Sequence, residues 1–70
     1  MTIATTSDTT RIFIDRARFA RAMSTAALQS HLNDRNLNAE VFEMAGRIGI
    51  DCLTIELADV VPVLQQHGLI

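Results

Sequence analysis

The sequence predicts a mostly α-helical domain of four short helices, preceded by a short extended segment near the N-terminus. Apolar residues make up 49% of the 70 residues, which excludes an intrinsically disordered chain. Most apolar positions recur at helical spacing, and residues suited to N-caps stand before these stretches. A chain of this length forms one domain. We therefore assign residues 11–70 to a single small helical domain and residues 1–10 to a flexible N-terminal arm.

The first fifteen residues contain no helical periodicity. Residues 1–10 are polar and rich in threonine, as in a loose terminal arm. Residues 11–15 alternate between the two sides of the chain, which is typical of a strand. No second convincing strand is evident to pair with this segment. It is therefore either an extended lead-in to the first helix or an edge that pairs across a dimer.

Two helices are predicted after the extended segment. Asp15 is a good N-cap for the first helix. A single helix continuing to Leu32 would carry apolar residues on opposite faces, because Leu32 would lie about 220° from Phe19 at 100° per residue. A break at Ser24 removes this conflict and supplies a cap for the second helix. The predicted helices span residues 15–23 and 25–34, and residues 34–38 form a turn.

Two further helices are predicted in the C-terminal half. Asn38 caps the third helix, whose apolar residues recur at helical spacing. They are Val41, Phe42, Ala45, Ile48 and Gly49, the last suited to a C-terminal cap. The fourth helix begins at Asp51 or Thr54 and ends near Gly68. Pro62 removes a backbone donor, so we expect a kink or a restart there.

One stretch carries the pattern of two helices joined by a tight turn. Residues 43–55 place a small residue, Ala45, where the helices would touch and a turn glycine, Gly49, four positions later. The apolar anchors of this pattern are Ile48, Ile50, Ile55 and Ala58. In these residues the chain resembles the helix-turn-helix regulators of the phage-repressor and Cro type. The resemblance implies a DNA-binding regulator of phage-like character.

A second register of the same resemblance uses earlier residues. Residues 19–23 and 24–33 resemble the family's second and third helices, and residues 44–51 would then form the helix that follows. The two registers together cover about residues 19–58. This register implies arginines that contact phosphates and polar side chains that contact base edges. The DNA-binding residues would be Arg16, Arg18, Arg21, Gln29, His31 and Arg35.

Charge is distributed unevenly along the chain. The chain has six arginines against eight acids and a net charge of −2. Residues 1–37 contain five arginines and three acids, a net charge of +2, whereas residues 38–70 contain one arginine and five acids, a net charge of −4. Such a split suits DNA on one side of the molecule and self-association on the other, but ordinary surface charge, with head-to-tail attraction between copies, is the simpler interpretation.

Two functions follow, both based on binding and not on catalysis. The first is a small, dimeric, helix-turn-helix regulator of transcription that binds DNA in the cytoplasm. The alternative is an inhibitor or adaptor that binds a protein through an apolar helix face and does not bind DNA. Its partner-binding or dimer residues would be Leu53, Leu57, Val60, Val61 and Leu64. A chain of this size buries a small core, which favours a homodimer or a complex with a protein partner.

Two other families match less of the chain. In a ribbon-helix-helix regulator, residues 11–15 of two copies would pair across a dimer and enter the major groove. Residues 49–57 resemble the motif around the phosphopantetheine serine of carrier proteins. Cys52 occupies the serine position there and cannot form the phosphodiester link, so we set this likeness aside.

Little in the sequence supports catalysis, cofactor binding or membrane insertion. His31 and His67 have no acidic or nucleophilic partner by spacing, and no phosphate loop or metal-ligand spacing is present. The lone Cys52 cannot form an internal disulfide and is interpreted as a small buried residue. No apolar run has the length of a membrane span, and no export signal is evident. We expect no cofactor, no metal and no small-molecule substrate.

Overall fold

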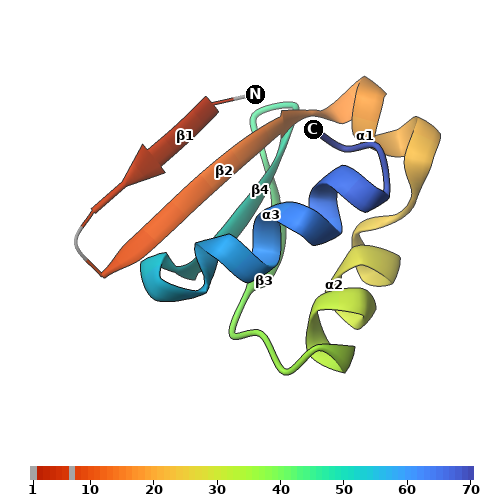
Figure 1. Cartoon of the computed structure of the whole chain (residues 1–70). Coiled ribbons are helices and arrows are strands. Elements are labelled where there is room, and N and C mark those ends of the chain that lie inside the picture. Colours follow the sequence, from red (N-terminus) through yellow and green to blue (C-terminus); the bar gives the residue numbers. More distant parts are fainter. Residues whose placement is uncertain (1, 7) are drawn as a thin grey trace.

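The computed structural model describes residues 2–6 and 8–70, and in them a four-stranded antiparallel sheet packs against three α-helices (Figure 1). The strands are β1 (Thr2–Thr5), β2 (Thr9–Asp15), β3 (Glu40–Met44) and β4 (Arg47–Leu53), in the order β1-β2-β4-β3. The helices are α1 (Arg16–Ala22), α2 (Thr25–Asp34) and α3 (Leu57–Gln66), and the short 3-10 turn η1 (Thr54–Glu56) precedes α3. The prediction of a mostly α-helical domain with four helices is therefore wrong.

One face of the sheet forms the core with the helices. Successive side chains of a strand point to opposite faces, and one set is buried: Ile12 and Ile14 on β2, and Ile48, Ile50 and Cys52 on β4. The helices meet this face with Phe19, Leu28, Leu32, Val60, Val63 and Leu64. In the described part of the chain no element covers the other face, which we call the open face.

The largest correction to the sequence prediction lies between β3 and β4. The helix expected from Asn38 to Gly49 and the helix-turn-helix expected over residues 43–55 are replaced by a β-hairpin. The apolar residues of this stretch fit a helical period, but Ile48 and Ile50 also alternate as in a strand. The sheet is favoured because β4 pairs with both β2 and β3 and buries its alternate side chains completely.

β2 is an inner strand of the sheet. Residues 11–15, expected to be a lead-in or a dimer edge, pair with β1 on one side and β4 on the other. They are therefore not free to form the intermolecular ribbon of a ribbon-helix-helix regulator. The segment expected to be a flexible arm contains β1 and the start of β2. Of that segment, Met1 and Ser7 lie outside the described residues.

Three helix ends predicted from local signals are confirmed, those at Asp15, Ser24 and Gly68. The Asp15 carboxylate accepts the Arg18 N–H at 3.2 Å, and the Ser24 hydroxyl accepts a backbone N–H of α2 at 3.1 Å. Asp15 thus begins α1, and Ser24 begins α2 and separates it from α1, as expected. Gly68 follows α3 with a φ of 72°, and the Leu69 N–H donates to the Leu64 carbonyl, as in a Schellman motif.

The C-terminal helix begins later than expected. β4 extends to Leu53 and η1 follows it, so α3 begins at Leu57 and not at Asp51 or Thr54. Pro62 lies inside α3, which continues to its last residue without a restart. The fourth helix of the sequence prediction is therefore the third α-helix of the structure.

The β3–β4 hairpin contains a strained turn. Ala45 and Gly46 connect the paired residues Met44 and Arg47, and both have positive φ, 49° and 76°. A two-residue loop with positive φ at both positions is a type I′ turn, which favours Asn-Gly. Alanine is disfavoured there because its Cβ approaches the following carbonyl oxygen.

Replacing Ala45 with asparagine should stabilise the protein. Asparagine tolerates the left-handed conformation better than alanine, so Ala45→Asn should raise the free energy of unfolding by about 1 kcal/mol. The same change at the exposed helical residue Ala20 should lower it by about 0.5 kcal/mol. Urea denaturation of both variants measures the two shifts. Destabilisation by Ala45→Asn would contradict the assignment of the turn.

Candidate functional site

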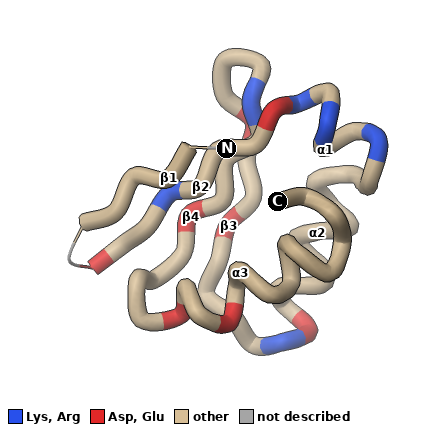
Figure 2. Tube along the Cα trace, turned by 45° about the horizontal axis from the view of Figure 1, so that its top comes forward, with Lys and Arg blue, Asp and Glu red and all other residues tan. Residues whose placement is uncertain are grey.

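Four arginines lie at one end of the sheet (Figure 2). Arg16, Arg18 and Arg21 are exposed on α1, which begins directly after the last residue of β2. That last residue, Asp15, pairs in the sheet with Arg47, the first residue of β4. The hairpin therefore brings Arg47 from the acidic half of the sequence to the three arginines of α1. We call these four residues the basic end.

The acids near the basic end do not cancel its charge. Asp15 caps α1, and the Glu43 Oε2 atom lies 3.8 Å from Arg16 Nη2 in an exposed ion pair. Four arginines and these two acids give this end a net charge of +2. The other two arginines and six acids give the rest of the chain a net charge of −4. The fold thus separates charge in space and not only along the sequence.

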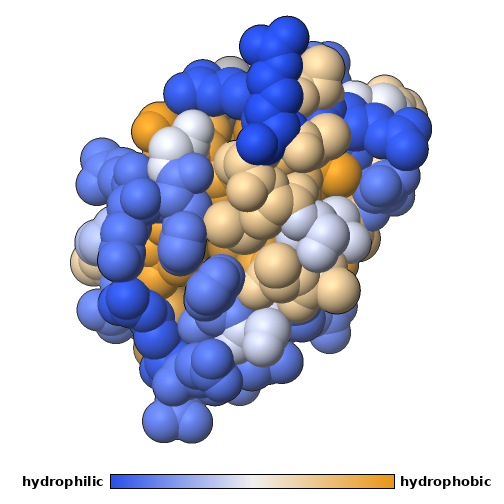
Figure 3. Space-filling view, turned by 90° about the vertical axis from the view of Figure 1, so that its right-hand side faces the viewer, coloured by the Kyte–Doolittle hydropathy of each residue, from blue (hydrophilic) through white to orange (hydrophobic). Residues whose placement is uncertain are grey.

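The arginines of α1 are separated by small side chains. Ala17, Ala20 and Ala22 are exposed beside them. On the face seen in Figure 3, strongly hydrophilic side chains lie at the top and also along the left side and the bottom, around a band of apolar residues. An alanine side chain is too short to cover a neighbouring guanidinium group. The guanidinium groups of α1 therefore remain accessible to a ligand.

An aromatic row crosses the open face. The strand register places Phe13 on β2, Gly49 on β4 and Phe42 on β3 side by side. The two rings meet edge to face, with centroids 6.5 Å apart and planes at 82°. Gly49 permits this arrangement, since a Cβ at that position would overlap the Phe42 ring. Both rings are half-buried.

Two guanidinium groups lie over this aromatic row. The Arg11 Cζ atom is 5.0 Å from the centroid of the Phe42 ring, and the Arg47 Cζ atom is 5.8 Å from that of the Phe13 ring, both within cation–π range. Arg11 Nε and Nη2 also donate to the two carboxylate oxygens of Asp51, at 2.6 and 3.0 Å. These hydrogen bonds, and then the negative charge of Asp51, raise the pKa of the Arg11 guanidinium.

Arg47 connects the two surfaces. It belongs to the basic end, and it also lies over the Phe13 ring of the open face. Within residues 2–6 and 8–70 it makes no ion pair, whereas Arg11 and Arg16 each make one. The Arg47 guanidinium can therefore exchange its ring contact for an anionic ligand without breaking a salt bridge.

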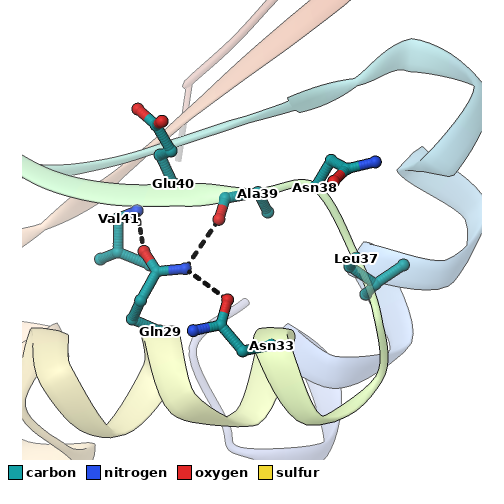
Figure 4. Close-up of a pocket in the computed structure, with 7 residues that line it drawn as sticks. All are labelled: Gln29, Asn33, Leu37, Asn38, Ala39, Glu40 and Val41. Carbon is teal, nitrogen blue, oxygen red and sulfur yellow. Dashed lines mark hydrogen bonds between the residues drawn. The ribbon is translucent and has the colours of Figure 1, made fainter.

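A polar groove of about 590 Å³ runs along the outer edge of β3 beside α2 (Figure 4). The Gln29 side chain spans it. Its Nε2 donates to the Ala39 carbonyl at 2.8 Å and to Asn33 Oδ1 at 3.1 Å, and its Oε1 accepts the Val41 N–H at 2.9 Å. The Gln29 amide thus takes the place of a neighbouring strand at the start of this edge of the sheet. Because these groups satisfy one another, the groove is a structural contact and a poor candidate for a ligand site.

The structure divides the six residues predicted to contact DNA. Three of them, Arg16, Arg18 and Arg21, lie together at the basic end. Gln29 is engaged with β3, as described. The His31 ring stacks on the His67 ring with centroids 4.5 Å apart. Arg35 follows the far end of α2, where it donates to Gln66 Oε1 at 3.2 Å.

The five apolar residues predicted to bind a partner divide between core and surface. Val60 and Leu64 are fully buried in the core, so they present no surface to a partner. Leu53, Leu57 and Val61 are half-buried. The large apolar residue most exposed in this region is instead Ile55 in η1, which is 86% exposed.

Other chemical groups of the chain do not form a site. Burial raises the pKa of the Cys52 thiol, and the carboxylates of Glu56 and Asp51 raise it further, so the thiol stays protonated and a poor nucleophile at neutral pH. Residues 2–6 and 8–70 contain no group of His, Cys, Asp and Glu side chains arranged to hold a metal ion. No helix in these ranges is long and apolar enough to cross a membrane.

No family model, curated protein or solved structure matches this chain. The candidate site is therefore defined by geometry alone, as the basic end and the open face that meet at Arg47. Arg47, Phe13 and Phe42 were not predicted as site residues from the sequence. The alternation of Ile48 and Ile50, typical of a strand, was the signal in the sequence that could have revealed the open face.

Replacing Gly49 with alanine should destabilise the aromatic row. The new Cβ overlaps the Phe42 ring, which must leave β4 and its contact with Arg11. We expect Gly49→Ala to lower the free energy of unfolding by about 1–3 kcal/mol. The cost should shrink in the Phe42→Leu background, because leucine lacks the ring that is displaced. Urea denaturation of the wild type, the two single variants and the double variant tests the contact between Gly49 and Phe42. If the two substitutions change the free energy of unfolding additively, the contact is contradicted.

Proposed function

We propose that this protein acts by binding nucleic acid through the basic end. The observation that carries the proposal is the gathering of Arg16, Arg18, Arg21 and Arg47 at one end of a chain whose net charge is −2. The planar guanidinium group of arginine donates two parallel hydrogen bonds to a phosphate. The proposal retains DNA as an expected partner and a non-enzymatic role, but without a helix-turn-helix.

The ion pair at this end offers little competition to a phosphate. Arg16 and Glu43 are 62% and 54% exposed and 3.8 Å apart, and such surface pairs contribute about 0–1 kcal/mol. Arg18 and Arg21 make no ion pair in the described part of the chain. A polyanion can therefore engage all four guanidinium groups at small cost.

The acidic remainder of the molecule favours one binding orientation. With a net charge of −4 it is repelled by a polyanion, whereas the basic end is attracted. The protein should therefore approach nucleic acid with α1 and the β3–β4 turn in front. This orientation leaves η1, which follows the other end of β4, away from the ligand (Figure 1).

A second candidate function is self-association through β1. All four residues of this strand are exposed and uncharged, and β1 is an edge of the sheet. The opposite edge, β3, is capped at its start by Gln29 and carries the acids Glu40 and Glu43. Ile3 is 45% exposed on the side of the helices, which do not cover it. A free edge strand without protecting charges can pair with another strand. The β1 strand of a second copy is such a strand and is also uncharged.

Removing two arginines of α1 should weaken nucleic-acid binding in a salt-dependent way. Affinity for a labelled DNA duplex should fall steeply between about 50 mM and about 200 mM salt. In the double variant Arg18→Ala, Arg21→Ala the slope of log affinity against log salt should decrease by about 1 for each arginine. Fluorescence anisotropy measures both quantities.

Arg35→Ala is the matched control, because Arg35 is exposed but lies outside the basic end. It should leave the salt slope nearly unchanged. If the wild-type protein does not bind DNA or RNA even at the lower salt concentration, the proposal is wrong. An equal loss of affinity in the control would place the contact elsewhere.

A charge on β1 should prevent the proposed self-association. Wild-type protein should have the molar mass of a dimer, and Ile3→Lys should have that of a monomer, because the substitution places like charges at the shared edge. Ile55→Lys adds the same charge at an exposed apolar position outside the sheet and should remain dimeric. Light scattering coupled to size-exclusion chromatography measures the mass. Wild-type protein that is monomeric throughout a concentration series would exclude this function.

A further inference from the structure

The aromatic row on the open face offers planar ligands two rings, at an angle of 82° to each other. Phe13 and Phe42 lie on the two strands that flank β4. Between them Gly49 contributes no side chain, so nothing on β4 rises between the rings in this row. The rings are half-buried, held by each other at 6.5 Å and by arginines at their faces. They are thus preorganised on a sheet that no other described element covers.

A hollow adjoins this row on the side of the basic end. It has a volume of about 210 Å³ and is lined by Thr2, Phe13, Ile14, Asp15 and Arg47. It therefore combines an aromatic ring, a cation, a hydroxyl and a carboxylate in one place. A carboxylate can accept a hydrogen bond from the amino group of a base, and a hydroxyl can donate or accept one.

Charges on the open face divide along the strands. In the row towards the basic end, Arg47 lies beside Asp15 on β2 but makes no ion pair with it in the described residues, and the Asp15 carboxylate instead accepts the Arg18 N–H. In the row on the other side of the phenylalanines, Asp51 is neutralised by Arg11, and Glu40 lies at the margin on β3. The half of the face that holds Arg47 and the hollow has no net charge and adjoins the arginines of α1, whereas the other half has a net charge of −1, so a polyanionic chain is favoured at the first.

We propose that the open face binds single-stranded nucleic acid, with unpaired bases stacked on Phe13 and Phe42 and phosphates on Arg47 and α1. This inference rests on the proposed function and specifies that the nucleic acid bound is single-stranded. The bases of a duplex stack on one another, so their faces cannot reach the two rings, whereas unpaired bases can be splayed out onto aromatic side chains. Base–aromatic stacking tolerates any sequence, because every base has a π-face.

Phenylalanine ring signals provide the first test. The chain has three phenylalanines, and the third, Phe19, is buried in the core at 2% exposure. In protein labelled on phenylalanine, titration with a short oligothymidylate or oligouridylate should shift the ring resonances of Phe13 and Phe42 upfield. The Phe19 resonance should not move. A short DNA duplex can draw Arg47 away from Phe13 but cannot reach the ring faces, so it should leave the Phe42 and Phe19 resonances in place.

Substitution of the rings provides the second test. Phe13→Leu and Phe42→Leu retain an apolar side chain but remove the stacking surface. Each should weaken binding of the oligothymidylate by about tenfold and leave binding of the duplex unchanged. Ile55→Ala, at an exposed apolar residue outside the open face, is the control and should change neither. An unshifted Phe19 signal verifies that each variant is folded.

The outcomes separate this inference from the proposal on which it rests. If both oligonucleotides and the duplex fail to bind, the basic end is not a nucleic-acid site and both proposals fail. If they bind through the arginines of α1 but the ring signals and the leucine variants show no effect, only the single-strand inference is overturned. If the substitutions change the molar mass of the protein and not its affinity for oligonucleotides, the open face binds a second copy and the inference is wrong. A preference between the two oligonucleotides decides whether the ligand is RNA or DNA.

Discussion

The three helices of this short chain can cover only one face of its four-stranded sheet, and the rest of the structure follows from this constraint. The covered face takes the isoleucines of β2 and β4 and forms the core. The side chains that alternate with them must meet water. Arg11, Asp51 and Arg47 do so as charged groups, and Phe13 and Phe42 are shielded in part by guanidinium groups. The open face therefore carries residues whose arrangement the core does not dictate, and these are the residues available for binding.

Local signals were sufficient to predict the helix ends at Asp15, Ser24 and Gly68, but not the sheet. The caps at Asp15 and Ser24 act within three residues of themselves, so the sequence around them contains the whole interaction. The pairing of Ile12 with Ile50 joins segments on either side of two helices, and no local pattern reports it. The hairpin was also concealed, because Ala45 occupies a position where type I′ turns favour asparagine or glycine. A helical period was then the simpler interpretation of residues 41–49.

The candidate site was predictable to a similar extent. The three arginines of α1 are neighbours in the sequence, and the structure keeps them together. Arg47 joins them only through the register of β2 with β4, which the sequence did not reveal. Gln29 illustrates the opposite error, since its amide is polar and lies on a helix, but hydrogen bonds to β3 occupy it. Polar residue type alone therefore does not distinguish a side chain that reads a ligand from one that completes a sheet edge.

The two proposed surfaces are compatible in one assembly. Two copies of β1 that pair in antiparallel orientation are related by a two-fold axis perpendicular to the sheet, and this axis leaves both open faces on the same side. The Ile3 side chains lie on the side of the helices, whereas the Phe13 rings lie on the open face. A dimer of this kind would therefore double the width of the binding surface without covering either aromatic row. Because its strands run in opposite directions, the two basic ends would lie at opposite ends of that surface, and Arg47 would lead a nucleic-acid strand onto each row from a different end.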